Sequence, residues 1–214
     1  MGASTPIKDQ LNCNACYAFS ALAAVEAHYK IKTGNIVSLS EQEIVDCSFE
    51  NDGCTGGLPH LVFNYIRSND ISYTRDYPYD EKTDSICRTQ YNSAKFQGYK
   101  VKGYVNLRKG ILNLIKAVSK GPIATISYAS PFFKQYRGGL YQGQGCDKEN
   151  KPNHSSLLIG YNLTGKRKYL IFKNGWGTDW GNDGIYTVEI GRLSSRNKGH
   201  CMIAATKFNS LPRL

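Results

Sequence analysis

Residues 15–30 constrain the fold more than any other stretch of this chain. Small and apolar side chains occupy almost every position there, so a helix formed from this run is apolar around nearly its whole circumference. Such a helix has to be buried on all sides, and Gly34 provides its stop signal. The 214 residues are enough to bury it, either in one large domain or between two lobes.

The remaining pattern predicts helices in the first half of the chain and strands in the second. A capping box of Ser40 and Glu43, in which each side chain satisfies the other residue's amide, opens the next helix. This helix is expected at residues 41–47, and further helices are expected at residues 58–67 and after Asn106. Runs of β-branched and aromatic residues beyond Pro122 predict strands at 123–128, 156–161, 169–173, 184–190 and 202–208. No linker or internal repeat interrupts this pattern, so the two lobes are expected to share a tight interface.

The net charge of +10 does not indicate a nucleic-acid-binding protein. The basic residues are scattered, and the longest basic run is Lys166-Arg167-Lys168. We interpret this charge as a solvated basic surface that would attract acidic polysaccharide or a membrane surface. No apolar run approaches the roughly 20 residues of a membrane span, so no span is expected.

Seven cysteines are many for a cytosolic chain and indicate the secretory route. The odd count predicts three disulfides and one free thiol. Glycosylation sequons at Asn153 and Asn162 agree with this interpretation. The opening residues contain no apolar signal-peptide region, so we expect any targeting segment to have been removed or to lie outside this sequence.

Cys13 and Cys16 have the spacing of a metal site or of a redox pair. A structural zinc needs four ligands, and the remaining cysteines do not supply a second close pair. A thioredoxin-like pair belongs to a fold that alternates strands and helices from its start, and that fold does not bring five further cysteines. We therefore expect neither a metal nor a cofactor.

A third interpretation makes Cys16 alone the functional thiol. It falls at the start of the predicted buried helix, where the partial positive charge of the helix N-terminus favours a thiolate. A thiolate nucleophile needs a histidine that pairs with it and later protonates the leaving amine. It also needs a third group that orients the histidine.

His154 is the best candidate among the four histidines, because it lies at the head of a predicted strand after a polar loop. Core, surface or capping positions are expected for His28, His60 and His200. Asn174 follows a later strand, and its carbonyl could fix the imidazole tautomer without adding a charge. The nearby Trp176 could shield that hydrogen bond from water.

These features together resemble the papain family of cysteine proteases, in its cathepsin L-like branch. Cys13-Asn14-Ala15-Cys16-Tyr17 is similar to the family pattern Cys-Gly-Ser/Ala-Cys-Trp/Tyr, and His154 and Asn174 follow at close to the family interval of about 130 to 150 residues. Further blocks in family order are residues 8–10, 39–47, 53–57, 76–79, 136–139 and 174–177. The resemblance covers essentially the whole chain.

The resemblance implies an α+β, papain-like two-lobe fold within one peptidase domain, residues 1–214. Its N-terminal lobe, about residues 1–105, would be mainly helical. Its C-terminal lobe, residues 106–214, would be an antiparallel, β-barrel-like lobe. The chain would cross between the lobes, and the active-site cleft would lie between them.

The resemblance also implies residue roles. Cys16 would be the nucleophile, His154 the general base and acid, and Asn174 the group that orients it, while Gln10 would donate to the oxyanion. Cys13 would pair with Cys54, Cys47 with Cys87, and Cys146 with Cys201. Substrate contacts are expected from Gly56, Gly57, Leu58, Pro59, Ile126, Pro152, Asn153, Trp176 and Thr206.

The activity so implied is that of a thiol endopeptidase with a preference for an apolar or aromatic P2 residue. It would be a secreted or lysosomal/vacuolar monomer that acts on proteins and peptides and is controlled by an inhibitory propeptide and by cystatin-like inhibitors. Three departures from the family pattern keep a second hypothesis open, a catalytically impaired homologue that acts as a binding or structural protein: Asn14 and Leu11 replace glycines, and Gly175 replaces a serine.

Overall fold

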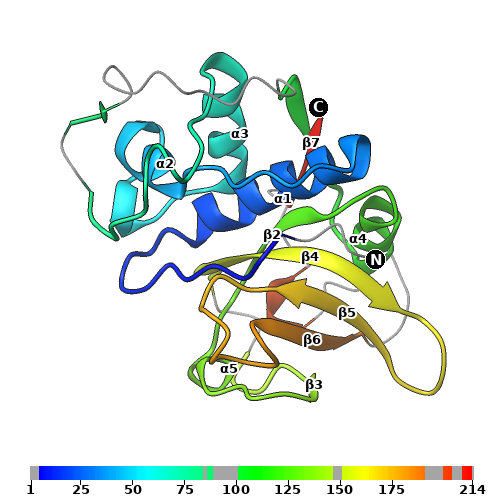
Figure 1. The fold of residues 1–214 in the computed structure, drawn as a ribbon. Helices are drawn as coiled ribbons and strands as arrows, with labels where there is room; N and C mark the ends of the chain where they lie inside the picture. The colour runs from blue at the N-terminus through cyan, green and yellow to red at the C-terminus, as the bar shows by residue number, and fades with distance from the viewer. Residues whose placement is uncertain are drawn as a thin grey trace.

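The computed structural model describes residues 5–83, 86–88, 101–146, 151–190, 200–203 and 209–213. Helix α1 (Cys16–Thr33) confirms the buried helix expected from the sequence, since every side chain from Tyr17 to Ala27 is buried. The helix ends at Gly34, whose φ of 77° lies in the left-handed region that glycine adopts without strain. α1 lies against the sheet on one side and against two further helices on the other (Figure 1).

The helices flanking α1 lie where the pattern predicts them: α2 (Glu41–Cys47) and α3 (Pro59–Ser68). Only half of the predicted capping box forms. Ser40 Oγ accepts the Glu43 N–H at 3.0 Å, but the Glu43 carboxylate accepts from Ser72 N at 2.7 Å and from Tyr65 Oη at 2.9 Å. The Ser40 amide donates to the Ser72 carbonyl instead. Glu43 therefore accepts hydrogen bonds from Ser72 and Tyr65 instead of bonding Ser40, because buried donors need a partner.

Two further helices lie in the second half of the chain. α4 (Ile111–Val118) confirms the helix expected after Asn106, and Gly110 precedes it. A short helix, α5 (Pro131–Lys134), was not predicted; the Ser130 hydroxyl caps it by accepting the Phe133 N–H at 3.1 Å. Four residues are too few for a periodic pattern to announce a helix.

The strands form one open seven-stranded sheet in the order β1-β7-β2-β4-β5-β6-β3. Their bounds are β1 (Gly103–Asn106), β2 (Ile123–Ser127), β3 (Leu140–Tyr141), β4 (His154–Asn162), β5 (Lys168–Lys173), β6 (Ile185–Ile190) and β7 (Ser210–Arg213). The neighbouring strands are antiparallel except β3 and β6, which pair in parallel. Among the described strands, β1 and β3 are separate edges, so the sheet is open and does not have the barrel-like closure that the resemblance implies.

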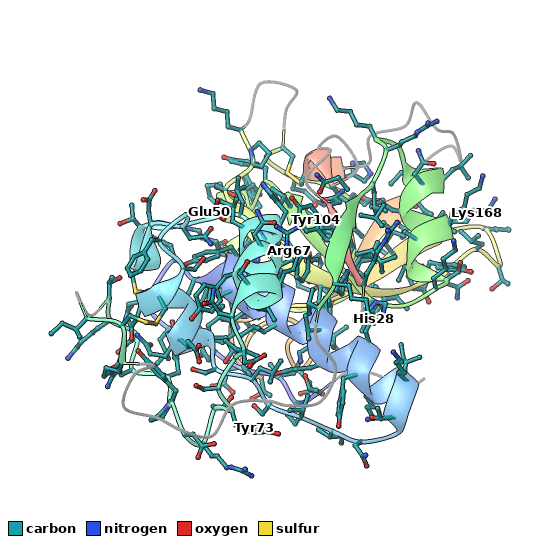
Figure 2. All side chains as sticks on the ribbon, turned by 90° about the horizontal axis from the view of Figure 1, so that it is seen from above. His28, Glu50, Arg67, Tyr73, Tyr104 and Lys168 are labelled. Carbon is teal, nitrogen blue, oxygen red and sulfur yellow. A yellow bond between two sulfur atoms is a disulfide. The ribbon has the colours of Figure 1, made fainter. Side chains whose placement is uncertain are left out.

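The strand expected at 202–208 falls largely outside the described residues. His200–Met202 forms a 3₁₀ turn, and the strand that enters the sheet afterwards is β7. β7, near the end of the chain, pairs with β1, and both strands contact α3. Tyr104 of β1 faces His60 and Phe63 of α3, with ring centroids 5.8 and 6.0 Å apart, and Figure 2 shows Tyr104 beside this helix.

Two groups of buried apolar residues make up the interior. One surrounds α1, α2 and α3, and the other lies among α4 and strands β2 to β6. The side chain of His28 in α1, labelled in Figure 2, hydrogen-bonds the Pro122 carbonyl through Nε2 at 2.9 Å. This bond connects α1, in the first group, to the residue directly before β2, in the second. The division of the chain into lobes near residue 105 stays a prediction.

A buried charge network ties the N-terminal segment to the rest of the fold. Lys8 Nζ contacts Glu26 at 2.9 Å and Glu41 at 2.7 Å, and Glu26 has no exposed side-chain surface. Thr5 Oγ1 donates to Glu26 at 2.7 Å, and Lys173 Nζ donates to Thr5 Oγ1 at 3.0 Å. The network therefore connects α1, α2 and β5 through the segment that leads to Gln10.

No helix among the described residues is long and apolar enough to cross a membrane. In the same residues, no three side chains of the His, Cys, Asp and Glu types gather as a metal site would need.

Candidate active site

A cleft of about 800 Å³ opens at the N-terminal end of α1. The residues that line it come from the segment before α1, from the loop before α3, from the ends of β2 and β4, and from α5 and the loop after β5. Its walls thus bring together parts of the chain that are more than 100 residues apart. The lining residues are Gln10, Leu11, Asn14, Cys16, Thr55, Gly56, Gly57, Leu58, Ile126, Ala129, Lys134, Pro152, Asn153, His154, Ser155, Trp176 and Trp180.

Cys16 is the first residue of α1 and lines the cleft. All seven cysteines lie within the described residues, and Cys16 is the one that forms no disulfide. The three disulfides have the pairing implied by the resemblance: Cys13–Cys54, Cys47–Cys87 and Cys146–Cys201. The first of them links the residue three before Cys16 to the residue that precedes Thr55 of the cleft lining.

His154 begins β4 and lies on the same cleft as Cys16. Its Nε2 is 2.8 Å from Asn174 Oδ1, and both side chains are buried. Because an amide oxygen can only accept, Nε2 carries the proton and Nδ1 is left to accept another. Asn174 Oδ1 also accepts the Gly175 N–H at 3.0 Å, which holds the amide in place.

Trp176 covers this pair. Its ring centroid is 4.5 Å from that of His154, and Trp180 meets Trp176 edge to face at 5.0 Å. This agrees with the expectation that a tryptophan next to Asn174 shields the hydrogen bond from water. Trp180 is itself held by a hydrogen bond from its Nε1 to the Lys134 carbonyl at 3.1 Å.

Burial shifts the pKa values of Cys16 and His154 in opposite directions. It raises the pKa of the Cys16 thiol to about 11, against backbone hydrogen bonds that lower it, because the thiolate loses water. Burial also lowers the pKa of His154 to about 4, partly offset by the hydrogen bond to Asn174. Burial thus disfavours the Cys16 thiolate and the His154 imidazolium when each is charged alone.

Gln10 lines the cleft beside Cys16 and is held on three sides. Its backbone N–H donates to the Gly175 carbonyl at 2.9 Å, and its carbonyl accepts from Tyr79 Oη at 2.8 Å. Its side-chain Nε2 donates to the Cys13 carbonyl at 2.8 Å. An amide nitrogen has two protons, so one N–H of Gln10 is left for an oxygen in the cleft.

Of the predicted substrate contacts that the structure describes, all but Pro59 line the cleft. Pro59 is buried in the first turn of α3 and is absent from the lining, and Thr206 lies outside the described residues. Asn153 uses its side chain locally: Oδ1 accepts the Ala129 N–H at 2.7 Å and Nδ2 donates to the Ala129 carbonyl at 3.4 Å. These bonds hold the residue directly before β4 and His154.

Gly57 keeps one wall of the cleft open to backbone. A Cβ at this position would collide with the Asn51 side chain and approach the Tyr17 ring to 2.9 Å. Asn51 cannot retreat easily, because its Oδ1 accepts the Leu58 N–H at 2.8 Å. A glycine is therefore required here by packing, which leaves the main chain accessible to an extended peptide.

The departures from the family pattern differ in their effects. Leu11 adopts a φ of 51°, a left-handed conformation that costs a leucine energy, and its side chain is 57% exposed at the cleft. Asn14 is exposed there as well. The atoms nearest to a Cβ at position 175 would belong to Phe19, from 3.4 Å, so the first atom of a serine side chain would fit there.

Sequence reasoning missed five lining residues: Thr55, Ala129, Lys134, Ser155 and Trp180. Thr55 precedes the quoted glycines and Ser155 follows His154, so neighbourhood could have suggested both. No local signal marks Ala129 or Lys134, because their position depends on how α5 folds against Trp176 and Trp180.

Comparison with known proteins agrees with this geometry. A family model described as papain family cysteine protease matches residues 1–210. Mexicain from Jacaratia mexicana is 36% identical over 211 residues, covering 97% of this chain and 92% of mexicain. Procathepsin L from Mus musculus is 37% identical over 212 residues, covering 95% of this chain but only 60% of that protein.

Solved structures show the same likeness. The bromelain protease of Ananas comosus, in complex with the E64 inhibitor, has a TM-score of 0.87 and 35% identity, and the match covers 100% of this chain and 95% of that one. The cysteine protease CMS1MS2 of Carica candamarcensis, in complex with E-64, has a TM-score of 0.86 and 32% identity, covering 99% and 93%. The chain therefore belongs to the papain family of cysteine proteases.

Proposed function

We propose that this protein is a thiol endopeptidase in which Cys16 is the nucleophile, His154 the general base and acid, and Asn174 the group that orients His154. The observation that carries the proposal is the 2.8 Å contact between His154 Nε2 and Asn174 Oδ1, in a cleft that also contains the free thiol. This contact leaves Nδ1 of His154 as the atom that exchanges a proton with Cys16.

The reaction follows from these roles. His154 takes the thiol proton, and the Cys16 sulfur attacks the carbonyl carbon of the substrate. The carbon–nitrogen bond then breaks while the imidazolium gives its proton to the leaving amine. Water, deprotonated by His154, attacks the resulting thioester, which releases the acid product and returns the proton to the sulfur.

Gln10 would stabilise the oxyanion that develops during both attacks. One side-chain N–H is held by the Cys13 carbonyl, and the other is available beside Cys16, as is the Cys16 backbone N–H at the start of α1. Donors fixed in this way need no reorganisation when charge develops on the carbonyl oxygen.

An extended peptide would pair with the main chain at Gly56 and Gly57, by addition of a strand. Leu58, Ile126 and Pro152 form an apolar wall next to this backbone, which supports a preference for an apolar or aromatic P2 side chain. The P2 preference is the more specific part of the proposal, because it depends on the direction in which the peptide lies along the cleft.

The relatives support a setting for this activity. Papaya proteinase 4, which is 34% identical, and procathepsin L suggest a secreted or lysosomal enzyme. The name procathepsin suggests control by a propeptide that occupies the cleft. We propose the same control here, together with inhibition by cystatin-like proteins and action as a monomer.

Labelling with the E64 inhibitor tests the proposal. The intact protein, without reduction, is exposed to E64 and weighed by mass spectrometry, with Cys16→Ala and His154→Ala as matched variants. One adduct that maps to Cys16, is lost in Cys16→Ala and forms slowly in His154→Ala is the expected result. A folded protein with three disulfides that takes no adduct and cleaves no peptide would instead favour a binding protein, in which the side chains of Leu11 and Asn14 obstruct the cleft.

A further inference from the structure

Apart from the proposed Cys16–His154 pair, Lys134 is the one residue with a full charge at neutral pH among the described residues that line the cleft. It ends α5, is exposed, and has no carboxylate of the described residues within ion-pair distance of its ammonium group. A single unpaired cation in a cleft that is otherwise neutral is a recognition element for an anionic group of a ligand.

The position of Lys134 relative to the reacting atoms follows from a series of contacts. The leaving amine must reach His154 to take its proton, so the part of the substrate after the scissile bond lies on the His154 side. Trp176 covers His154 at 4.5 Å, Trp180 packs on Trp176 at 5.0 Å, and Trp180 Nε1 donates to the Lys134 carbonyl at 3.1 Å.

The backbone of α5 holds Lys134 against this wall. Its N–H donates to the Ser130 carbonyl at 3.1 Å, and Ser130 Oγ caps the helix. Lys134 and His154 line the same cleft, and the Lys134 charge adds to burial in lowering the pKa of the imidazole.

We propose that Lys134 selects substrates with an acidic side chain at the first or second residue after the scissile bond. The inference rests on the proposed endopeptidase function and names the substrate class of that site. A carboxylate of Asp or Glu would accept a hydrogen bond from the ammonium at the edge of the cleft. The net charge of +10 would also draw acidic peptides toward the enzyme.

The test uses pairs of fluorogenic peptides that differ only in Glu or Gln at one of these two positions. We expect kcat/KM of the wild type to be about two- to fivefold higher for the Glu peptide at low salt, as for an exposed ion pair, and the ratio to fall toward one at high salt. Lys134→Gln is expected to bring the low-salt ratio to about one, and Lys134→Glu to favour a peptide with Lys. Lys116→Gln, on the exposed face of α4, is the matched control and should keep the wild-type ratio.

Because each ratio compares two peptides on one protein, a partly unfolded variant does not distort it. Equal turnover of Glu and Gln peptides by the wild type, or an unchanged ratio in Lys134→Gln, would overturn this inference alone. No turnover of any peptide by the wild type would overturn the proposed function and this inference with it.

Discussion

Ser20 and Ser155 share a hydrogen bond of 2.6 Å in the buried space between α1 and β4. Ser155 Oγ also reaches the Thr125 carbonyl at 2.8 Å and Ser20 Oγ the Tyr17 carbonyl at 3.2 Å, so either hydroxyl can supply the proton between them. Ser20 lies one turn after Cys16, and Ser155 directly follows His154. The bond therefore connects the helix of the proposed nucleophile to the strand of the proposed base.

We predict that Ser20→Ala lowers the free energy of unfolding by about 1 kcal/mol, because the buried Ser155 hydroxyl loses a hydrogen-bond partner. Urea unfolding measures this change. Ser119→Ala removes an exposed hydroxyl and should stay within about 0.5 kcal/mol of the wild type. Equal effects of the two substitutions would show that the bond between α1 and β4 contributes nothing to stability.

Gln10→Ala tests the proposed oxyanion donor. We expect kcat for a neutral peptide to fall about a hundredfold to a thousandfold with little change in KM, because the donor acts on charge that exists only in the transition state. Steady-state kinetics at saturating peptide measure both constants, and thermal unfolding serves as the control for folding. A rise in KM at constant kcat would assign Gln10 to ground-state binding instead.

The pH dependence of Cys16 alkylation tests the role of His154. In His154→Ala the thiol has no proton acceptor, and burial holds its pKa near 11, above its ordinary value. A raised thiol pKa means less thiolate at neutral pH, so the alkylation rate of the variant should rise about tenfold per pH unit from pH 8 to 10. The wild type should already react at pH 7, and its alkylation rate should change little from pH 8 to 10. A variant that reacts at pH 7 as fast as the wild type would argue against the pairing of these residues.

Glu26→Gln is expected to destabilise the protein by about 3 kcal/mol. Glu26 is fully buried and receives hydrogen bonds from Lys8, Thr5 and the Leu39 amide, so its loss leaves a charge and buried donors poorly compensated. Glu189→Gln, which changes an exposed pair with Arg167, is the matched control and should leave the denaturation midpoint nearly unchanged. A midpoint for Glu26→Gln equal to that of the control would contradict the importance of the network.

Gly57→Ala should lower both stability and peptide turnover, since the added Cβ displaces Asn51 and with it the hydrogen bond to Leu58. Gly160→Ala is the control, because a Cβ there meets Ile171 at an ordinary 3.7 Å. Differential scanning calorimetry and kcat/KM measure the two effects. If Gly57→Ala were tolerated as well as Gly160→Ala, the wall of the cleft would be more adaptable than its packing indicates.

Local pattern predicted what depends on neighbours along the chain. The apolar run of residues 15–30 required a buried helix, and Cys16 had to lie at its start. Most of the strands followed from their β-branched composition, because these periodicities are properties of a single segment. The resemblance then assigned His154, Asn174 and Gln10 to the same cleft, where the structure has them lining the walls or packed behind them.

Other features required the tertiary structure. Glu43 turns away from Ser40 toward Ser72 and Tyr65, the sheet stays open, and β3 pairs with β6 in parallel. The sequence alone determined which segments must be buried and which side chains could react, because burial and helix position are encoded locally. Only the tertiary structure decided that Ser155 meets Ser20 and that Lys134 faces the cleft, because such contacts depend on strand order and on the path of the loops between distant segments.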